Sequence, residues 1–438
     1  MLFKLLFLVC GLALGLLPLE LAFLGVIAVG FAVLTFVNIN LSFGFFILGM
    51  SIIPDPLWSN MLLLMAAVFY WGVFILQYFL GKRSGVDTKY IIPSLVIYVL
   101  FCVLSFFTGF GGMDSVRVAS IMFSIIALGL LLTNIVETKK HLDQQVFFVF
   151  LALILTSIYG IFQHSLGIAI SAEFVDLWAN PGLPGRLYST MGNPNNFAKY
   201  LVMLMPFCVA YAFNAKGQFR VMLMAGLIVP IVVALVLTFS RASYLAVLGM
   251  VFVYILMIKP RLIAVAIIVG ILAIPFLPEV IIMRMSTVGT DTSSLYRILI
   301  WEGVFRVIQS YWSQGIGIGP DAFTLIYRAY AHNLAGPAMH SHNVFLNVWV
   351  EVGIGGALAL VFYNITTARA SVGTYFNTTD KEIKHYIAAG LAGLAAFIMF
   401  SMVEHVWFYP RTMLAYFLMM GLVWATIRAS SKAKENNV

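Results

Sequence analysis

HSHNVFLNVWVEVGIGG, residues 340–356, carries the chain from a polar stretch into a long apolar run. Two histidines stand at this junction. Each residue of an α-helix advances about 100° around the axis, which predicts Gly353 and Gly356 within about 40° of His342. Two glycines on one helical face allow a neighbouring helix to pack closely. The junction is therefore a candidate functional site at the start of a closely packed helix.

Three polar residues, Asn343, Asn347 and Glu351, repeat at four-residue spacing along the same run. This spacing predicts a second, polar face, with the Glu351 carboxylate roughly 13 Å along the helix from His342. A charge is expensive in an otherwise apolar membrane segment. We interpret Glu351 as a structural residue that neighbouring polar groups hold in place.

The composition is that of an integral membrane protein. Of the 438 residues, 62% are hydrophobic and only 10% are charged, whereas soluble domains carry about 25% charged residues. The net charge of +8 does not indicate nucleic-acid binding, because the lysines and arginines are scattered through short connectors. The sequence therefore predicts an all-α, polytopic membrane protein that contacts membrane lipids and no nucleic acid.

The three cysteines, Cys10, Cys102 and Cys208, lie singly inside apolar runs. Their spacing matches neither a disulfide framework nor a zinc site. The connectors assigned below to the external face also lack an Asp-x-Asp metal motif. We expect no metal and no cofactor.

The apolar segments predict twelve to fourteen membrane crossings. A span needs about 17 to 25 residues, so the segment at 41–53 is too short to span unaided and the first two are marginal. Lys4 precedes an apolar start without a cleavage pattern, which predicts a retained first span. The segments are 2–18, 21–37, 41–53, 61–80, 91–108, 116–136, 145–166, 195–214, 219–238, 241–258, 261–277, 343–366, 383–402 and 408–428.

Lysine and arginine in the short connectors predict the orientation by the positive-inside rule. From residue 61 onward, the predicted spans place every basic connector on one side, which is then cytoplasmic. These connectors lie around 82–89, 139–140, 216–220, 259–261 and 369–384, and the tail from Arg428 is also basic. The connectors 54–60, 109–117, 167–194 and 278–341 are then external.

The longest external connector is predicted to carry an amphipathic helix at residues 293–312, where apolar residues recur at helical spacing around charged ones such as Arg297. Such a helix is typical of the membrane surface. The glycine-rich stretch 315–320 ends it as a turn. The chain divides into N-terminal spans with the first external loop (1–194), central spans (195–277), the long external loop (278–341), and C-terminal spans with a cytoplasmic tail (342–438).

The predicted topology brings four basic residues to one membrane face. Arg241 begins a span after a tight external turn, Arg297 lies on the amphipathic helix, and His340 and His342 precede the next span. A guanidinium donates two hydrogen bonds to phosphate oxygens while it stays charged, which suits a lipid-linked diphosphate. A neutral imidazole can accept the proton of a sugar hydroxyl.

Each of these residues also has a structural interpretation. An arginine at the end of a span is commonly an interfacial anchor. For the two histidines, the alternative to catalysis is a purely structural role, in which they cap or orient the helix that they precede. Glu404 and His405, at another outward end, are interpreted as part of an aromatic interface belt.

Three ordered motifs resemble those of O-antigen ligases and related Wzy-type polymerases. His342-Asn343, nine residues and then Gly353-Ile354-Gly355-Gly356 resemble the family's His-Asn-x9-Gly-x-x-Gly pattern. Gly192-Asn193-Pro194-Asn195-Asn196-Phe197-Ala198 and Ser240-Arg241-Ala242 are similar to two further stretches of the family. The resemblance covers residues 185–360, whereas the N-terminal spans match only in hydropathy.

The resemblance implies a metal-independent glycan transferase at the outer face of the cytoplasmic membrane. Its donor would be an undecaprenyl-diphosphate-linked saccharide, and its acceptor a sugar hydroxyl on a lipid-anchored core or a growing chain. Arg241 and Arg297 would bind the donor diphosphate, and His342 would activate the hydroxyl, with His340 as the rival base. The residues that would support the site are Asn343, Glu351, Gly353 and Gly356.

Several functions remain open at this point. A ligase, a polymerase and a protein O-oligosaccharyltransferase share the donor chemistry and differ in the acceptor. A lipid-linked glycan flippase belongs to another class, and transporters place polar residues near the bilayer midplane. Here Glu351 is the one clear carboxylate deep in a predicted span, which favours transfer over transport. A scaffold of an envelope complex would leave the external arginines dispensable.

Overall fold

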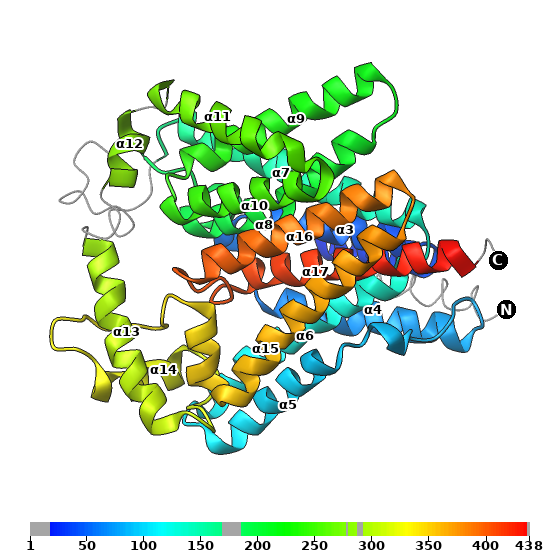
Figure 1. Cartoon of the computed structure of the whole chain (residues 1–438). Coiled ribbons are helices and arrows are strands. Elements are labelled where there is room, and N and C mark those ends of the chain that lie inside the picture. Colours follow the sequence, from blue (N-terminus) through cyan, green and yellow to red (C-terminus); the bar gives the residue numbers. More distant parts are fainter. Residues whose placement is uncertain (1–17, 169–184, 277–278, 287–291, 436–438) are drawn as a thin grey trace.

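The protein is a bundle of helices in the part of the chain that the structure, a computed structural model, describes: residues 18–168, 185–276, 279–286 and 292–435 (Figure 1). The α-helices are α2 (Leu19–Val37), α3 (Ile39–Ile52), α4 (Met61–Phe79), α5 (Pro93–Thr108), α6 (Gly112–Ile135), α7 (Lys139–Ser165), α8 (Pro194–Asn214), α9 (Gln218–Leu237), α10 (Arg241–Ile258), α11 (Ile263–Ala273), α12 (Glu279–Ser286), α13 (Thr292–Tyr311), α14 (Pro320–Tyr330), α15 (Val344–Asn377), α16 (Lys381–Ser401) and α17 (Pro410–Glu435). Short 3-10 helices are η1 (Asp55–Leu57), η2 (Thr88–Tyr90), η4 (Ser189–Met191), η5 (Pro260–Leu262) and η6 (Ile274–Phe276).

Nine of the described helices are long and apolar enough to cross a membrane: α4, α6 to α10 and α15 to α17. Four shorter apolar helices are Leu24–Val37, Ile39–Ile52, Pro93–Thr108 and Pro260–Phe276. The all-α class and the multi-pass membrane character are thereby confirmed. The predicted total of twelve to fourteen crossings stays a prediction. The predicted first span at 2–18, with Lys4, lies outside the described residues.

The basic connectors meet at one end of the bundle. Lys139 forms ion pairs with Asp380 at 3.0 Å and with Glu382 at 2.7 Å, and Arg83 pairs with Glu137 at 3.1 Å. These residues come from connectors that the charge pattern had assigned to a single side. The helices α13 and α14 lie at the other end of the bundle (Figure 1).

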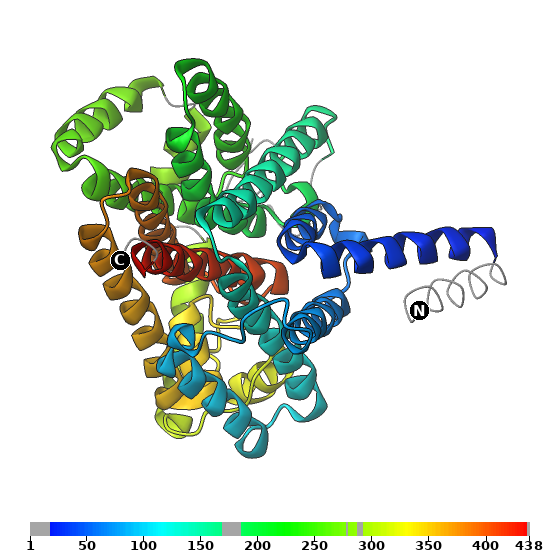
Figure 2. The same cartoon turned by 90° about the vertical axis from the view of Figure 1, so that its right-hand side faces the viewer.

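The last helix, α17, lies in the middle of the bundle (Figure 2) and is buried against α6, α7, α8, α15 and α16. An arginine near each end caps a neighbouring helix. Arg411 donates hydrogen bonds to the carbonyl oxygens of Met50, Ser51 and Ile53 at the end of α3. Arg428 does the same at the end of α6. The last carbonyls of a helix lack partners of their own, so both arginines fix α17 along the bundle axis.

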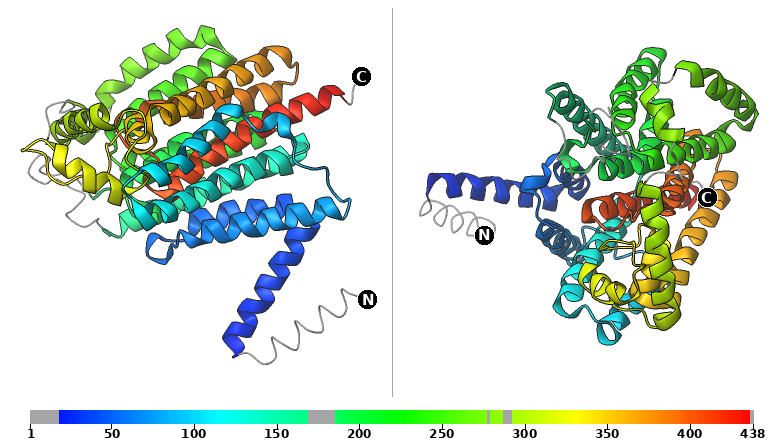
Figure 3. Two further views of the ribbon diagram at one scale, coloured as in Figure 1. Left: turned by 90° about the horizontal axis from the view of Figure 1, so that it is seen from below. Right: turned by 90° about the vertical axis from the view of Figure 1, so that its left-hand side faces the viewer.

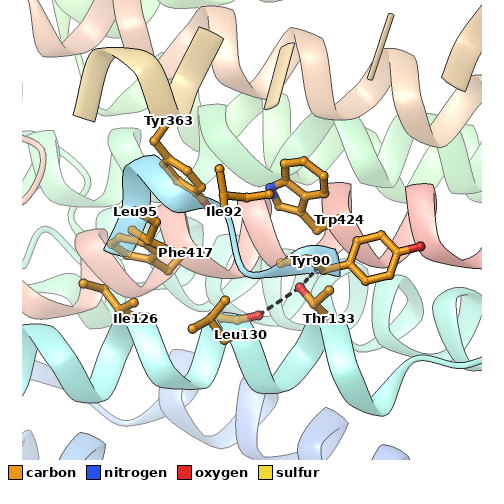
Figure 4. A pocket seen from close by; sticks show the side chains of 11 residues that line it. Tyr90, Ile92, Leu95, Ile126, Leu130, Thr133, Tyr363, Phe417 and Trp424 are labelled. Atoms are coloured by element: carbon orange, nitrogen blue, oxygen red, sulfur yellow. Dashed lines mark hydrogen bonds between the residues drawn. The ribbon is translucent and has the colours of Figure 1, made fainter. Parts of the chain in front are cut away.

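Glycines bring α17 and α6 into close contact. A Cβ added at Gly421 would lie 2.7 Å from the carbonyl oxygen of Gly129, so only glycine fits there. The Thr133 hydroxyl lies 3.3 Å from both glycine carbonyls (Figure 4). The crevice beside this crossing has a volume of about 10 Å³, which is room for about one water molecule. Small residues at helix crossings are typical of membrane bundles.

The helix α2 extends away from the rest of the bundle (Figures 2 and 3). Its described side chains are mostly exposed, among them Leu21, Leu24, Val26 and Ile27. An apolar helix that is exposed in this way fits an environment of lipid.

The loop predicted to be external, residues 278–341, contains more helix than the sequence predicted. The expected amphipathic helix is present as α13, with Ile300 and Val304 buried and Leu295 and Ile298 exposed. It packs against α14 and the start of α15. The sequence did not predict α12 or α14. Each is at most three turns long, which is too short for its apolar pattern to stand out from a loop.

The buried guanidinium of Arg428 gives a test of this packing. It donates hydrogen bonds to the carbonyls of Thr133 at 3.1 Å, Asn134 at 2.6 Å and Val136 at 3.3 Å. Arg428→Met leaves these buried acceptors without a donor, which is expected to lower the free energy of unfolding by about 3 kcal/mol. The measurement is the midpoint of thermal unfolding in detergent. Lys89→Met changes an exposed cation at the same end and should leave the midpoint unchanged, whereas equal midpoints for both variants would contradict this role.

Candidate functional site

The loop before α15 is held in one conformation by its own polar groups. The Ser341 backbone N–H donates to the Asn347 side chain at 2.9 Å, and the indole of Trp301, from α13, donates to the Ser341 carbonyl at 2.8 Å. His342 has a φ of 51°, in the left-handed region that few residues other than glycine adopt. Residues held in such a conformation cluster at functional sites. The fold therefore constrains the backbone at His342.

Asn343 begins α15 and ties it to the α16–α17 connector. Its side-chain oxygen accepts hydrogen bonds from the N–H groups of Phe345 at 2.9 Å and Leu346 at 3.0 Å, which is the preferred chemistry of a helix N-cap. Its amide nitrogen donates to the Met402 carbonyl at 3.0 Å. This second bond brings residues 402–409 beside His342.

Glu404 stands at the centre of the resulting cluster. One carboxylate oxygen lies 2.9 Å from His342 Nδ1, and the other lies 3.4 Å from an Arg297 guanidinium nitrogen. Burial opposes ionisation of this carboxyl, but Lys199, His342 and Arg297 outweigh that effect and hold the pKa of Glu404 well below its usual range. Glu404 is therefore a buried carboxylate that three basic groups share.

Lys199 joins α8 to the same cluster. The side chain is 2% exposed, and its ammonium group donates to the Asn196 side chain at 3.3 Å and to the His405 carbonyl at 3.4 Å. An isolated buried ammonium is very costly. The nearby carboxylate of Glu404 offsets that cost, so the two charges belong to one electrostatic unit.

The two histidines of the loop have different surroundings. His342 directs Nδ1 at Glu404, which assigns the proton to Nδ1 and leaves Nε2 as an acceptor. His340 Nδ1 accepts the backbone N–H of His342 at 3.1 Å, and its ring lies 4.3 Å from that of Phe408. Burial, and then the neighbours His342 and His405, lower the pKa of His340 to about 2. His340 is therefore neutral at physiological pH.

Arg186 links the other two family-like motifs to each other. Its guanidinium donates to the Asn195 side chain at 2.8 Å and to the Thr238 carbonyl at 2.9 Å, three residues before Arg241. Asn193 caps α8, which carries Lys199. Arg241 is the first residue of α10, beside this turn. Arg297 thus contacts Glu404 directly, whereas Arg241 is placed by the turn that Arg186 holds.

The helical count from His342 to the glycines does not hold. His342 lies outside α15, and Gly353, with a φ of 76°, interrupts it. A Cβ at Gly353 would overlap the Ser313 carbonyl, and the Ile354 N–H donates to the Trp312 carbonyl at 2.8 Å. Gly353 therefore contacts the backbone of residues 312 and 313, in the loop before α14, instead of a neighbouring helix.

Gly356 and Glu351 connect α15 to two other elements. Gly356 lies against Phe101 of α5, where an added Cβ would come within 3.3 Å of the Phe101 Cβ. The Glu351 carboxylate accepts the backbone N–H of Gly319 at 3.1 Å. Glu351 therefore connects α15 to the glycine-rich turn that precedes α14.

Sequence reasoning missed the residue at the centre of the site. Glu404 and His405 were interpreted as part of an aromatic belt, but both are buried, at 6% and 5% exposure, and Glu404 contacts two of the predicted site residues. Lys199 was not considered at all. Two signals in the sequence could have indicated these residues. One is a lysine inside an apolar run, and the other is a Glu-His pair at the end of a predicted span, because charged side chains are expensive to bury there.

His340, His342 and Glu404 place potential metal ligands within 4.8 Å of one another. Such a set can hold a metal ion when its carboxylate is available. Here Arg297 and Lys199 already neutralise Glu404, and a divalent cation would be repelled by both. The chemistry of the site therefore favours a carboxylate that orients an imidazole.

The fold and this cluster define a polytopic α-helical membrane protein with a histidine–carboxylate site at one end of its bundle. Residues 223–361 match the family model described as O-antigen ligase. This match supports the resemblance to the O-antigen ligase family that the motifs indicated, over about a third of the chain. The matched region includes Arg241, Arg297, His340 and His342, and it excludes Glu404. No curated protein matches the sequence.

The buried imidazole of His405 predicts acid sensitivity. Burial, and then Lys199, lower its pKa to about 3, although Glu404 opposes this. An unfolded histidine has a pKa of about 6.5, so between these values the unfolded state binds the additional proton. Stability contributed by a neutral His405 is then lost as the pH falls below about 6.5, by at most about 1.4 kcal/mol per pH unit.

The test is the thermal unfolding midpoint in detergent at pH 7.5 and at pH 5. We expect a smaller decrease for His405→Gln than for the unaltered protein. His340 also lowers stability at pH 5, but it does so in both proteins. Glu404 stays ionised between pH 5 and pH 7.5, because its pKa is held below the usual range. An equal decrease in both proteins would contradict the assignment of a neutral, buried His405.

Proposed function

We propose that this protein transfers a saccharide from an undecaprenyl-diphosphate donor to a sugar hydroxyl at the outer face of the cytoplasmic membrane. The match of residues 223–361 to the O-antigen ligase family supports glycan transfer as the class of reaction. The observation that carries the mechanism is the pairing of His342 with the buried Glu404 at 2.9 Å, beside Arg297.

In this proposal His342 is the general base. Its Nε2 takes the proton of the acceptor hydroxyl while the acceptor oxygen bonds to the anomeric carbon of the donor sugar. The bond from that carbon to the diphosphate oxygen breaks, and undecaprenyl diphosphate leaves with the electron pair. Glu404 holds the ring by its Nδ1–H and stabilises the positive charge that develops on it. His340 is the weaker candidate, because its Nδ1 already accepts a backbone N–H and its pKa is low.

Arg297 and Arg241 are proposed to bind the diphosphate. Guanidinium groups stabilise the charge that develops on a leaving diphosphate, which is the role a metal ion fills in many transferases. Arg297 also contacts Glu404, so the donor site and the base would share one charge network. This arrangement supports transfer without a metal.

The proposed orientation follows from the positions of the charges. α16 begins at the basic end, where Glu382 pairs with Lys139, and Glu404 follows its other end. If the basic connectors are cytoplasmic, the Glu404 cluster faces outward. The acceptor then distinguishes three related functions: a ligase uses a lipid-anchored core, a polymerase a growing glycan, and a protein O-oligosaccharyltransferase a protein.

The first test is a transfer assay in membranes with an undecaprenyl-diphosphate glycan and candidate acceptors. His342→Ala removes the base and Arg297→Ala removes a diphosphate ligand, so each is expected to reduce transfer at least about a hundredfold per molecule of folded protein. Two matched controls, His164→Ala and Arg306→Ala, change a histidine and an arginine outside the cluster and should retain activity. Full activity in both site variants would refute the mechanism.

The second test uses a chelator in the same assay. Because two guanidinium groups are proposed to neutralise the diphosphate, transfer should persist in excess EDTA. A loss of transfer that a divalent ion restores would instead favour a metal held by His340, His342 and Glu404, whose ligand atoms lie within 4.8 Å.

A further inference from the structure

A cavity of about 260 Å³ adjoins the Glu404 cluster. His405 and Phe408 line it, and the ring of each also lies against the ring of His340, at centroid distances of 5.4 Å and 4.3 Å. The volume corresponds to roughly nine water molecules at about 30 Å³ each, which is enough for a sugar ring. We call it the Asp114 cavity, after a carboxylate in its wall.

The wall of the Asp114 cavity combines polar groups of both signs with an aromatic surface. Asp114 and Glu351 contribute carboxylates on either side of Gly319, whose N–H donates to Glu351 and whose added Cβ would lie 2.9 Å from Asp114 Oδ2. Arg117, Asn347 and Trp407 complete the polar wall. A sugar presents hydroxyls that both donate and accept, together with apolar C–H faces that suit an indole ring.

Several polar atoms of this wall have no hydrogen-bond partner among the described residues. These atoms are His405 Nδ1, Trp407 Nε1 and Asp114 Oδ2. The side chains of His405 and Trp407 are 5% and 7% exposed, so both are almost fully buried. Buried polar groups are nearly always paired, and these two residues line the cavity. Their partners are therefore expected from whatever occupies the cavity.

The Asp114 cavity is open at the protein surface, and one of its wall residues belongs to the loop that carries the proposed base, His342. Met339, which is 62% exposed, and the exposed Arg117 belong to its wall, so a ligand can enter. Met339 directly precedes His340, whose ring lies 4.2 Å from the ring of His342. His342 itself does not line the cavity, so a bound saccharide would extend past the His340 ring to bring a hydroxyl to His342.

We propose that the Asp114 cavity binds the acceptor saccharide, with its hydroxyls on Asp114, Glu351, His405 and Trp407. The inference rests on the proposed function, because it takes His342 as the base and Arg297 as a ligand of the donor. Arg297 and His342 contact different oxygens of Glu404, so donor and acceptor would approach the base from different directions. In this proposal Glu351 binds an acceptor hydroxyl in addition to its contact with the Gly319 turn.

The test measures kinetic constants for donor and acceptor separately. Asp114→Asn replaces a carboxylate oxygen, which accepts hydrogen bonds, with an amide nitrogen, which donates them. Trp407→Phe removes the indole N–H and keeps an aromatic ring. Each is expected to raise the KM for the acceptor about tenfold, which corresponds to one lost hydrogen bond of about 1.4 kcal/mol in a buried site. The donor KM and kcat should stay within about twofold, because the groups bind the acceptor equally before and during the reaction.

A third variant avoids any change to the buried wall. Met339→Trp narrows the entrance at an exposed residue and should raise the acceptor KM as well. Leu334→Trp, at another exposed residue of the same loop and outside the cavity, serves as the matched control and should leave it unchanged. The delipidated acceptor glycan should inhibit transfer competitively with the acceptor in the unaltered protein.

The outcomes separate the two proposals. Transfer with an unchanged acceptor KM in all three cavity variants would overturn the acceptor site and leave the proposed function standing. A selective rise in the donor KM would also overturn it, because the cavity would then hold the donor glycan. No transfer by the unaltered protein to any acceptor glycan would overturn both proposals.

Discussion

The buried carboxylate of Glu404 is the group on which the end of the bundle that carries α13 and α14 depends. A lone charge at 6% exposure would be very costly, but basic groups from three other elements offset that cost: Lys199 of α8, Arg297 of α13 and His342 before α15. Segments far apart in the chain must therefore meet for any of them to be stable. Removal of one partner leaves the remaining charges uncompensated, so the cluster has a single favourable arrangement.

This requirement explains the backbone around the site. His342 adopts a left-handed φ of 51° so that its ring can reach Glu404, while Asn343 starts α15 and bonds to the Met402 carbonyl. At Gly353 the helix is interrupted and contacts the loop that carries α13. The two arginines of α17 fix the central helix at both ends, and they leave the α16–α17 connector in a defined place. The site is thus built from loops that rigid helices position.

Local sequence patterns predicted most of the helices and only part of the site. Apolar runs predicted where most helices start to within a few residues, although α15 continues to Asn377, well beyond the predicted end at 366. The motif around Asn343 marked the start of α15. Both signals lie within a few consecutive residues. The contact of Glu404 with His342 spans 62 positions in the chain, and a hydropathy pattern carries no such information. The interruption at Gly353 was missed for the same reason, since the Ser313 backbone that requires it comes from the distant loop before α14. The interpretation of Glu404 as part of an aromatic interface belt failed, because the position of a residue at the end of a predicted span does not reveal whether its side chain is buried.

The most direct test of the central claim is the activity of Glu404→Gln in the transfer assay. Glutamine keeps the size and a hydrogen-bond acceptor but removes the charge that orients His342 and stabilises its protonated form. We predict a lower midpoint of thermal unfolding, because Lys199 loses its carboxylate, and a loss of transfer of at least about a hundredfold in kcat per molecule of folded protein. Transfer at the unaltered rate would show that His342 acts without its carboxylate and would contradict the account.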